Sequence, residues 1–412
     1  MPNGLPNMLQ RYRSTAFFAF IILAFYFILP SPSWLGDQTS LGPPEILNAT
    51  LGFQKIFVIS LPARTDRRDA MTLAAALTNI DVTWINGVSG DEVSDRVLPA
   101  DSAGKAISKG NKGSWRAHMN ALRTVVHQNM TSALILEDDA DWDVRIKPQL
   151  QLFAQAARAF TQPTATNDQE SLAEADHVST THQENLPLSQ LPPITHPTLT
   201  PYGDNWDVLW LGHCGTDFPP PANDTNLITP SHPVSPPPLR VTIPNDATVP
   251  EPQHLKPHPF ALQDPLASLY PPHTRVVHAA SGTTCTQAYA VSQRGARKLL
   301  WQFGLQTFTT GWDLMLGKWC DGEYITSTNS NERPMAISKR PVCVTVQPPL
   351  FSHHYGKGAA SDITSPGGGF IDKEKEMTPY VRLSVRLNME KLVGGAGVGE
   401  LVDQWPDEVA VY

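Results

Sequence analysis

The sequence predicts an α/β domain around a mainly parallel sheet, preceded by one membrane-spanning helix. Three observations support this prediction. Short apolar runs typical of buried strands alternate with longer stretches of helical periodicity, which is the order expected for a parallel sheet. One of these strand-like runs leads directly into three acidic residues. Near the amino terminus, an unbroken apolar run follows two arginines.

The first element of the domain is a strand. Residues 55–61 (KIFVISL) are rich in β-branched side chains and are followed by the turn Pro62-Ala63, which indicates a buried strand. The other predicted elements are, in order, a helix over 69–77, a strand over 82–85, a helix over 113–128, a strand over 133–136, a strand over 206–212, and a strand and helix within 287–300.

Two segments differ in composition from the rest of the chain. Residues 161–203 are polar and mixed, and residues 217–273 are dense in proline. Neither has helix or strand periodicity, so we expect insertions or disordered loops there. The domain itself is expected over 53–370, followed by a C-terminal extension over 371–412.

The amino terminus carries a candidate membrane anchor. Arg11 and Arg13 precede a bulky, aromatic-rich apolar run that ends at Pro30. Residues 15–30 would make a helix of roughly 22–25 Å, short for a bilayer but workable with snorkelling. A cleaved signal peptide is the alternative, but no small-residue cleavage site follows the run. The arginines predict a cytoplasmic tail over 1–14, which makes the rest of the chain lumenal, with a stem over 31–52.

Composition narrows the function classes. The formal net charge of −8 and the sequence pI of about 5.9 argue against a protein that binds nucleic acid through its phosphates. The four cysteines have no C-x-x-C pair, so zinc-ribbon and redox motifs lack support. Two disulfides are possible, and the sequence does not decide among the three ways of pairing the four cysteines. We favour Cys214–Cys285 with Cys320–Cys343, and four buried free thiols are the alternative. Sequons at Asn48, Asn129 and Asn223 permit a lumenal location.

Glu137, Asp138 and Asp139 form the sharpest local motif. They follow a buried strand, and α/β folds bind ligands outside the carboxyl ends of their strands. Hard divalent cations take carboxylate oxygens together with substrate phosphates, so this cluster can hold a metal that clamps a diphosphate. Asp141 and Asp143 extend the acidic run. The alternative interpretation is a solvated acidic turn that caps the next helix.

Basic and imidazole side chains provide further candidates. Arg64, Arg67 and Arg68 can bind phosphate, and Asp66 can accept from ribose or uracil, although a charged helix start has the same composition. His118 shares a helix face with apolar residues and is more typical of a core than of a ligand site. His353 and His354 follow a strand-like segment and are candidates for metal or phosphate binding; two exposed loop histidines are the alternative.

These motifs occur in an order that resembles glycosyltransferase family 25, the lipooligosaccharide and collagen galactosyltransferase-like proteins. The similar segments are IFVISLPARTDRR (56–68), GSWRAHMNAL (113–122), LILEDDADW (134–142), WDVLWLG (206–212), TQAYAVSQRGARKLL (286–300), GWDLML (311–316), PPLFSHH (348–354) and SDI (361–363). No single segment is specific, but eight in the same order are. The chain departs from the family at Ser114, where Cys is usual, and at Ala117, where Ser is usual.

The resemblance implies a GT-A-type nucleotide-sugar fold, a UDP-sugar donor (often UDP-galactose), manganese dependence and inversion. Inversion in one displacement requires a general base for the acceptor hydroxyl, for which the family segment suggests Asp313, with Asp207 as the fallback. By the same resemblance, Glu137, Asp138 and Asp139 form the metal and donor site, and Asp139 binds the metal most directly. His353 and His354 are added to the metal candidates because of their position after a strand-like segment. The remaining candidates for donor binding are Arg64, Asp66, Arg67, Arg68, His118 and Asp138.

With the predicted anchor, the resemblance implies a single-pass type II protein of the Golgi or ER membrane, whose lumenal domain acts on a glycan or protein acceptor. Two other interpretations remain. A non-catalytic lumenal binding protein of the same fold is one, although all three acids of the motif are present. A two-metal phosphodiesterase is the other, and it would require more His and Asp ligands spread over several strand ends.

Overall fold

The computed structural model describes residues 43–99, 102, 106–165, 185–219, 240–258, 262–325, 340–357 and 375–407. From residue 42 onward the chain forms one compact unit. Within the described residues, no helix is both long and apolar enough to cross a membrane. The predicted tail and anchor, over 1–14 and 15–30, lie outside the described residues.

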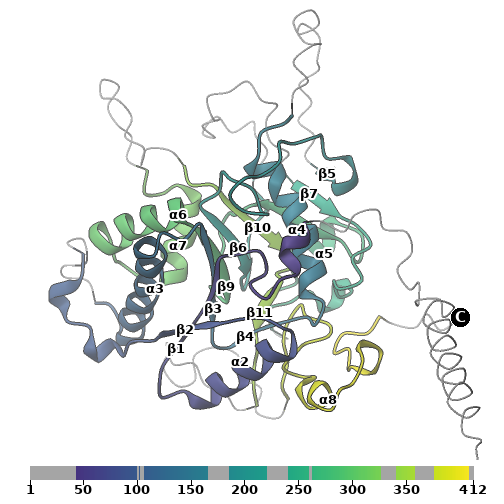
Figure 1. Cartoon of the computed structure of the whole chain (residues 1–412), viewed down its shortest axis with the longest axis horizontal. Coiled ribbons are helices and arrows are strands. Elements are labelled where there is room, and N and C mark those ends of the chain that lie inside the picture. The colour runs from purple at the N-terminus through teal and green to yellow at the C-terminus, as the bar shows by residue number, and fades with distance from the viewer. Residues whose placement is uncertain are drawn as a thin grey trace, which may run out of the picture. The chain divides into compact units, whose positions relative to one another are not determined.

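The unit is organised around one large mixed sheet (Figure 1). In chain order, the strands are β1 (Lys55–Ser60), β2 (Thr83–Asn86), β3 (Ser132–Glu137), β4 (Ala140–Trp142), β5 (Asn185–Pro187), β6 (Val208–Gly212), β7 (Arg240–Ile243), β8 (Arg275–Ala279), β9 (Ala288–Ser292), β10 (Cys343–Gln347) and β11 (Phe351–His353). Across the sheet, the order is β2-β1-β3-β9-β6-β10-β8-β7-β5, and β11 joins β6 to β4.

Most strands of this path point in the same direction. The pairs β1–β2, β1–β3, β6–β10 and β5–β7 are parallel, whereas β9 and β8 run antiparallel to both of their neighbours. The prediction of an α/β fold with a mainly parallel sheet is therefore confirmed in its coarse form. The sheet is mixed because β9 and β8 reverse direction.

Helices cover both faces of the sheet. The longer helices are α2 (Thr65–Leu77), α3 (Lys109–His127), α4 (Ile146–Thr161) and α7 (Trp312–Asp321), and the shorter ones are α5 (Leu266–Leu269), α6 (Gln293–Leu299) and α8 (Met389–Val393), with a π-helix over Leu300–Gln306. Additional 3-10 turns are Pro44–Leu47, Gly90–Glu92, Asp95–Val97, Leu188–Gln190, Pro252–His254 and Val398–Glu400.

Side-chain alternation along the strands divides the core in two. On β1, Ile56 and Val58 pack with α2 and α4, whereas Phe57 packs on the opposite face with α3, α6 and α7. Figure 1 shows α3, α6 and α7 gathered on one side of the sheet. The helices predicted over 69–77 and 113–128 are thus present, each beginning about four residues earlier than expected.

Parts of the predicted insertions and stem belong to the fold. Strand β7 lies within 217–273 and pairs with β8, and β5 lies within 161–203 and pairs with β7, so the expectation of segments without regular structure is wrong at these strands. In the predicted stem, Ile46 and Leu51 are fully buried in the same core as β1. Residues 43–52 therefore form part of the folded unit.

Two disulfides connect elements that are distant in sequence. Cys214 pairs with Cys285, and Cys320 pairs with Cys343, which confirms the favoured connectivity and excludes four free thiols. The first bridge joins the segment after β6 to the segment before β9. Because β9 runs antiparallel to β6, these two segments lie at the same edge of the sheet.

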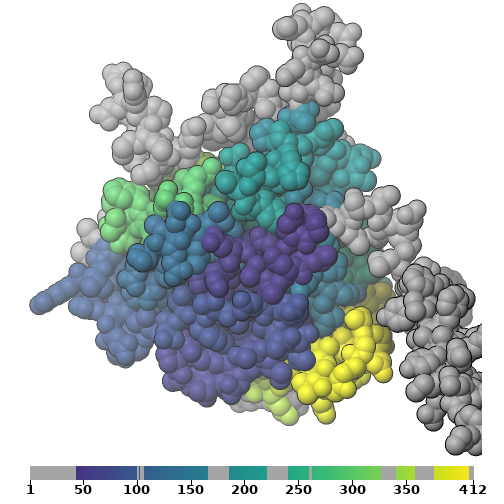
Figure 2. Space-filling view, viewed as in Figure 1, coloured from purple at the N-terminus to yellow at the C-terminus, as the bar shows by residue number. Residues whose placement is uncertain are grey.

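The segment after residue 375 packs back on the domain. Residue pairs Asp143–Ser384 and Tyr355–Met377 form isolated β-bridges to it, and α8 contacts α2. Figure 2 shows this segment in yellow against the surface beside α2. The residues expected as a C-terminal extension are therefore integrated into the domain where they are described.

Candidate functional site

The candidate site lies at the carboxyl ends of β1 and β3. These strands are parallel, with Ile59 opposite Glu137, so the residues that follow them emerge at the same edge of the sheet. Asp138 and Asp139 form the turn after β3, and Arg67 lies in the first turn of α2, which follows β1. This edge is where open α/β sheets bind ligands.

Arg67 connects the two aspartates of the turn. Its Nη1 lies 2.6 Å from Oδ1 of Asp138 and 2.8 Å from Oδ2 of Asp139. The three side chains are only 14%, 10% and 15% exposed, respectively, so the charges are little screened by solvent. Burial alone would raise the pKa of Asp139, but the charges of His353, Arg67 and Arg386 outweigh it and lower that pKa. Asp139 is therefore held as a carboxylate.

The other two acids of the motif are more easily protonated. Burial, followed by the charge of Asp139, raises the pKa of Asp138 in spite of Arg67. Burial, with a further contribution from Asp139, raises the pKa of Glu137 to about 8. One oxygen of Glu137, Oε1, accepts a hydrogen bond of 2.6 Å from Thr286 Oγ1. Glu137 is thus a buried carboxyl group that exchanges its proton near neutral pH.

His353 reaches the same turn from β11. Strand β11 pairs with β4, and His353 lies opposite Ala140. Its Nδ1 is 3.6 Å from Oδ1 of Asp139, and its ring packs on Tyr355 with centroids 4.3 Å apart. Among the described residues, this Oδ1 is buried without a hydrogen-bond partner. A buried carboxylate oxygen without a partner beside an imidazole nitrogen fits a divalent cation held by Asp139 and His353.

His354 faces the other way, so its prediction as a metal ligand beside Asp139 is wrong. Its Nδ1 lies 3.1 Å from Oγ1 of Thr378 and 3.9 Å from Oδ2 of Asp141. Burial lowers the pKa of His354 to about 4, which keeps the imidazole neutral. His354 follows the last residue of β11, and its ring is directed at Thr378 and Asp141, whereas the ring of His353 lies beside Asp139.

The arginines of the segment after β1 have distinct partners. Arg64 forms a bidentate pair with Asp66, at 2.9 and 2.7 Å, and this hydrogen bonding lowers the pKa of Asp66 to about 2. Arg68 donates to the carbonyl of Ser60 and to Oδ1 of Asn86, and its guanidinium lies over the ring of Trp84. Arg67, in contrast, contacts the two aspartates of the acidic turn.

Asp313 approaches the site from the first turn of α7. Its Oδ2 accepts a hydrogen bond of 3.1 Å from the backbone N–H of Cys285, next to Thr286. The charge of Asp313 contributes to the raised pKa of Glu137, so the two carboxyl groups lie within electrostatic range. The Cys214–Cys285 disulfide fixes the backbone that positions Asp313.

Asp207 lies at the opposite edge of the sheet, so its prediction as a fallback base is wrong. It precedes β6, whose Val208 is aligned through β9 with Ala133, whereas the acidic turn follows the far end of β3. The carboxylate of Asp207 is fully buried against Arg294 Nε at 2.9 Å and Lys298 Nζ at 2.8 Å. Asp207 therefore has a structural role.

His118 belongs to the core rather than to the donor site. It is 2% exposed, its Nδ1 lies 2.9 Å from the hydroxyl of Tyr289, and its ring stacks on Trp312 at 5.0 Å. Burial lowers its pKa to about 3. Its prediction as a donor-binding residue is wrong, and the alternative of a satisfied core histidine holds.

Glu251, His273 and Asp407 form a separate group in which three potential ligand atoms lie within 4.8 Å of one another; it is the one such group among the described residues. Arg382 pairs with Asp407 at 2.9 Å, and this guanidinium already neutralises the exposed carboxylate. The group is far from the acidic turn in sequence and includes none of its residues.

Sequence reasoning missed Thr286 and Arg386. Thr286 precedes β9, and its role depends on β9 running antiparallel to β3, which no local pattern indicates. Arg386 lies 248 residues from Asp138, to whose carbonyl it donates a hydrogen bond. Its surroundings (VRLSVRLN) have no motif, so no signal in a single sequence identifies this contact.

Comparisons with known proteins show a similarity over the amino-terminal part of the domain. Residues 53–192 match the model of glycosyltransferase family 25 (LPS biosynthesis protein), a range that contains Arg67 and the acidic turn. Procollagen galactosyltransferase 1 of Danio rerio is 29% identical over 120 residues, which cover 26% of this chain and 20% of that protein. The inactive glycosyltransferase 25 family member 3 of Homo sapiens is 26% identical over 119 residues, again 26% of this chain and 20% of that protein.

The probable inactive glycosyltransferase 25 family member 3 of Bos taurus is 25% identical over 143 residues, 32% of this chain and 24% of that protein. The matches therefore span about a fifth to a quarter of the length of these relatives. They include galactosyltransferases and proteins described as inactive. The part of this chain that matches glycosyltransferase family 25 is thus residues 53–192, which contain the acidic turn.

Proposed function

We propose that this protein is a metal-dependent, inverting glycosyltransferase of the GT-A type, which moves a hexose, galactose being the first candidate, from a UDP-sugar to a glycan or protein acceptor. The observation that carries the proposal is the buried oxygen Oδ1 of Asp139, which has no hydrogen-bond partner among the described residues and faces His353 at 3.6 Å. A purely structural carboxylate would satisfy both of its oxygens, as Asp141 and Asp207 do.

Asp139 and His353 would hold a divalent cation such as Mn²⁺. When bound, this ion supplies positive charge that stabilises the diphosphate of the departing nucleotide. Arg67 keeps Oδ2 of Asp139 engaged and adds a second positive charge close to the same position. Electrostatic stabilisation of a leaving group by preorganised charges is among the largest contributions to catalysis.

We assign the proton transfer to Asp313. Its Oδ2 is fixed by the N–H of Cys285, and we assign the acceptor hydroxyl proton to Oδ1. A positioned base of this kind contributes roughly 10²- to 10⁴-fold to the rate. Burial and, to a smaller extent, the charges of Asp139 and Asp313 raise the pKa of Glu137 to about 8.

The two disulfides and the relatedness to procollagen galactosyltransferases support a secretory-pathway location. Golgi or ER residence as a single-pass type II membrane protein is part of this proposal. It depends on the apolar run over 15–30, which precedes the described unit.

The test uses the full chain, made in a eukaryotic secretory host so that the disulfides form. UDP release is measured for a panel of UDP-sugars, with Mn²⁺ and then with chelator, beside an Asp139→Ala variant. We expect release from one donor that both chelator and the substitution abolish. An Asp207→Asn variant is the matched control, because it removes a buried aspartate at the opposite edge of the sheet. Release that persists in Asp139→Ala would contradict the proposal.

A non-catalytic binding protein of the same fold is the second candidate, because relatives described as inactive match over 119 and 143 residues, compared with 120 residues for a procollagen galactosyltransferase. This candidate predicts that Mn²⁺-dependent binding of a UDP-sugar occurs without release of UDP at any acceptor tested. Titration calorimetry of the donor on the folded wild-type chain, run beside the release assay, separates the two.

A further inference from the structure

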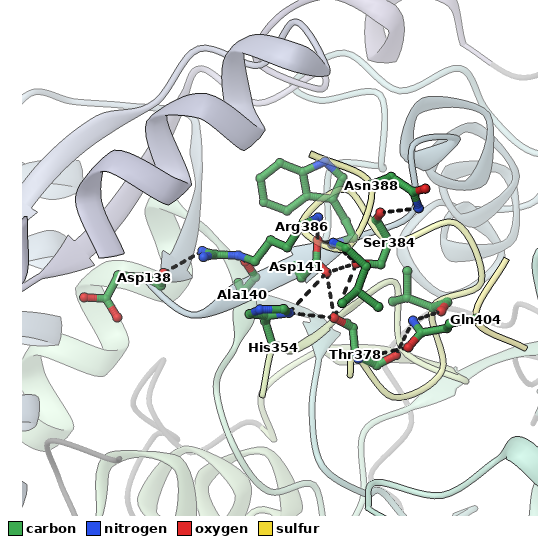
Figure 3. A network of polar contacts seen from close by, with 12 residues as sticks. Asp138, Ala140, Asp141, His354, Thr378, Ser384, Arg386, Asn388 and Gln404 are labelled. Atoms are coloured by element: carbon green, nitrogen blue, oxygen red, sulfur yellow. Dashed lines mark hydrogen bonds and ion pairs between the residues drawn. The ribbon is translucent and has the colours of Figure 1, made fainter. Parts of the chain in front are cut away.

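The acidic turn is covered by a segment from the other end of the domain. Residues 377–388 lie over β4 and β11, where Ser384 bridges Asp143 and Met377 bridges Tyr355 (Figure 3). This segment lies outside the part of the chain that matches the family model. Thr378 and Ser384 of this segment bind Asp141 of β4, and Arg386 reaches the turn after β3, so the segment bears on how that turn is held.

Asp141 is the anchor of this contact. It is fully buried, and each of its oxygens is engaged twice. Oδ1 accepts from the N–H of Trp142 at 2.8 Å and from the N–H of Arg386 at 3.2 Å, and Oδ2 accepts from the hydroxyls of Thr378 and Ser384. A buried carboxylate needs such partners, because removing one leaves a desolvated charge. The segment is thereby fixed against β4.

Arg386 uses this fixed position to hold the backbone of the turn. Its Nη2 donates to the carbonyl of Asp138 at 2.7 Å, and its Nε donates to the carbonyl of Ala140 at 3.1 Å. The carbonyl between them, that of Asp139, accepts from the N–H of His354 at 2.9 Å. All three consecutive carbonyls of the turn are therefore bound, two of them by one guanidinium.

This arrangement determines where the carboxylate of Asp139 points. A two-residue turn has few backbone hydrogen bonds of its own, so without outside donors its dihedral angles are free to vary. The planar fork of an arginine matches two carbonyls at fixed spacing, whereas a lysine ammonium is a single point donor. The local geometry thus requires an arginine and not merely a positive charge.

We propose that Arg386 is a positioning residue of the donor site, which fixes the Asp138–Ala140 backbone so that Asp139 and His353 face the same metal position. The metal part of this inference rests on the proposed function, whereas the backbone part does not. The inference also makes the segment 377–388 a component of the site. Residues that orient metal ligands typically contribute about 10- to 100-fold to metal affinity.

The test compares Arg386→Lys and Arg386→Met with Arg382→Met in the full chain. Arg382 lies on the same segment but pairs with Asp403 and Asp407, away from the acidic turn. Hydrogen exchange followed by mass spectrometry reports on the peptide that covers 137–143. We expect faster exchange there in both Arg386 variants and wild-type exchange in Arg382→Met. Wild-type exchange in Arg386→Met, or equal acceleration in Arg382→Met, would overturn the positioning role.

Binding of Mn²⁺ alone is then measured from the paramagnetic resonance signal of the free ion. We expect affinity to fall about 10- to 100-fold in Arg386→Lys and to stay unchanged in Arg382→Met. Wild-type affinity in Arg386→Lys would overturn the link to the metal. Absence of Mn²⁺ binding in the wild-type chain would instead overturn the metal dependence in the proposed function, and the exchange data would still decide the backbone role.

Discussion

Arg67 Nη1 lies 2.8 Å from Oδ2 of Asp139, and the same nitrogen lies 2.6 Å from Oδ1 of Asp138. One guanidinium nitrogen thus joins two adjacent carboxylates, and it leaves Oδ1 of Asp139 directed toward His353. Burial raises the pKa of Glu137 and of Asp138, whereas the charges of His353, Arg67 and Arg386 outweigh burial at Asp139 and lower its pKa.

The Arg67 contact predicts a selective effect on donor use. Arg67→Lys keeps the charge but removes the Nη1 atom that contacts both carboxylates, so kcat/KM for the donor should fall about 10- to 100-fold, the equivalent of one charge-assisted hydrogen bond. Arg68→Lys is the control, because Arg68 contacts Ser60 and Asn86 instead. Steady-state kinetics with the accepted UDP-sugar provide the measurement, and equal losses in both variants would contradict the assignment.

We expect Glu137 to lower the free energy of unfolding at neutral pH while it contributes to activity. Its folded pKa, about 8, is raised above the ordinary value of 4.5, so its contribution to stability is complete below pH 4.5 and is lost as the pH rises toward 8. Glu137→Gln removes this loss and keeps an acceptor for Thr286. In the presence of chelator at pH 7.5, we expect the free energy of unfolding to rise by about 1–3 kcal/mol.

Urea unfolding of the wild type and of Glu137→Gln, repeated from pH 5 to pH 8, tests this expectation, with the exposed Glu323→Gln as control. The two curves should approach each other toward pH 5. Turnover should meanwhile fall in Glu137→Gln, as expected for a group retained for activity at the expense of stability. A parallel offset at all pH values would mean that packing, not titration, separates the variants.

Substitution of Asp313 should affect catalysis, whereas substitution of Asp207 should affect stability. Asp313→Asn removes the assigned base, so kcat should fall at least about 100-fold while donor KM changes little. Asp207→Asn leaves Arg294 and Lys298 without their carboxylate and should lower the free energy of unfolding by about 1–3 kcal/mol, with kcat per folded molecule unchanged. Parallel kinetics and urea titrations check both, and a normal kcat in Asp313→Asn would show that another group accepts the proton.

Two buried histidines should make the fold sensitive to acid. Burial lowers the pKa of His213 and of His278 to about 4, so both imidazoles are neutral in the folded chain. As the pH falls below 6.5, the unfolded chain gains protons that the folded chain does not bind. Between pH 6.5 and pH 4, each imidazole should therefore lower the free energy of unfolding by about 1.4 kcal/mol for each pH unit.

The measurement is the free energy of unfolding as a function of pH, for the wild type and for His278→Gln. The variant should have a shallower slope below pH 6.5. His127→Gln, which changes an exposed histidine at the end of α3, should keep the wild-type slope. If His278→Gln also kept that slope, the assignment of a neutral buried imidazole would be wrong.

Much of the sheet and part of the site follow from local sequence patterns. The strands at 55–61, 133–136 and 206–212 were predictable because apolar runs rich in β-branched residues are read within a few positions. The acidic turn was predictable because it directly follows such a run. The favoured cysteine pairing was also confirmed, although sequence alone left three connectivities open.

The wrong predictions share a physical cause. A local sequence pattern does not show in which direction a strand runs in the sheet or which elements it pairs with. Asp207 and Asp139 both adjoin β-strands, but Asp207 precedes β6 whereas Asp139 follows β3. Because β3 and β6 both run antiparallel to β9, the two aspartates lie at opposite edges of the sheet. Strand β7 escaped notice because its partner β8, and not its own short sequence, determines that it is a strand. The contact between Arg386 and the acidic turn could not be predicted for the same reason.

The contact between Arg386 and Asp138 spans 248 residues of chain, and this has a consequence for biosynthesis. Residues 53–192 are synthesised before residues 377–388, whose Arg386 binds the backbone of the acidic turn. The contacts that fix this turn can therefore form only after residues 377–388 have been made. A chain that ends before Arg386 would lack both hydrogen bonds that this side chain donates to the turn.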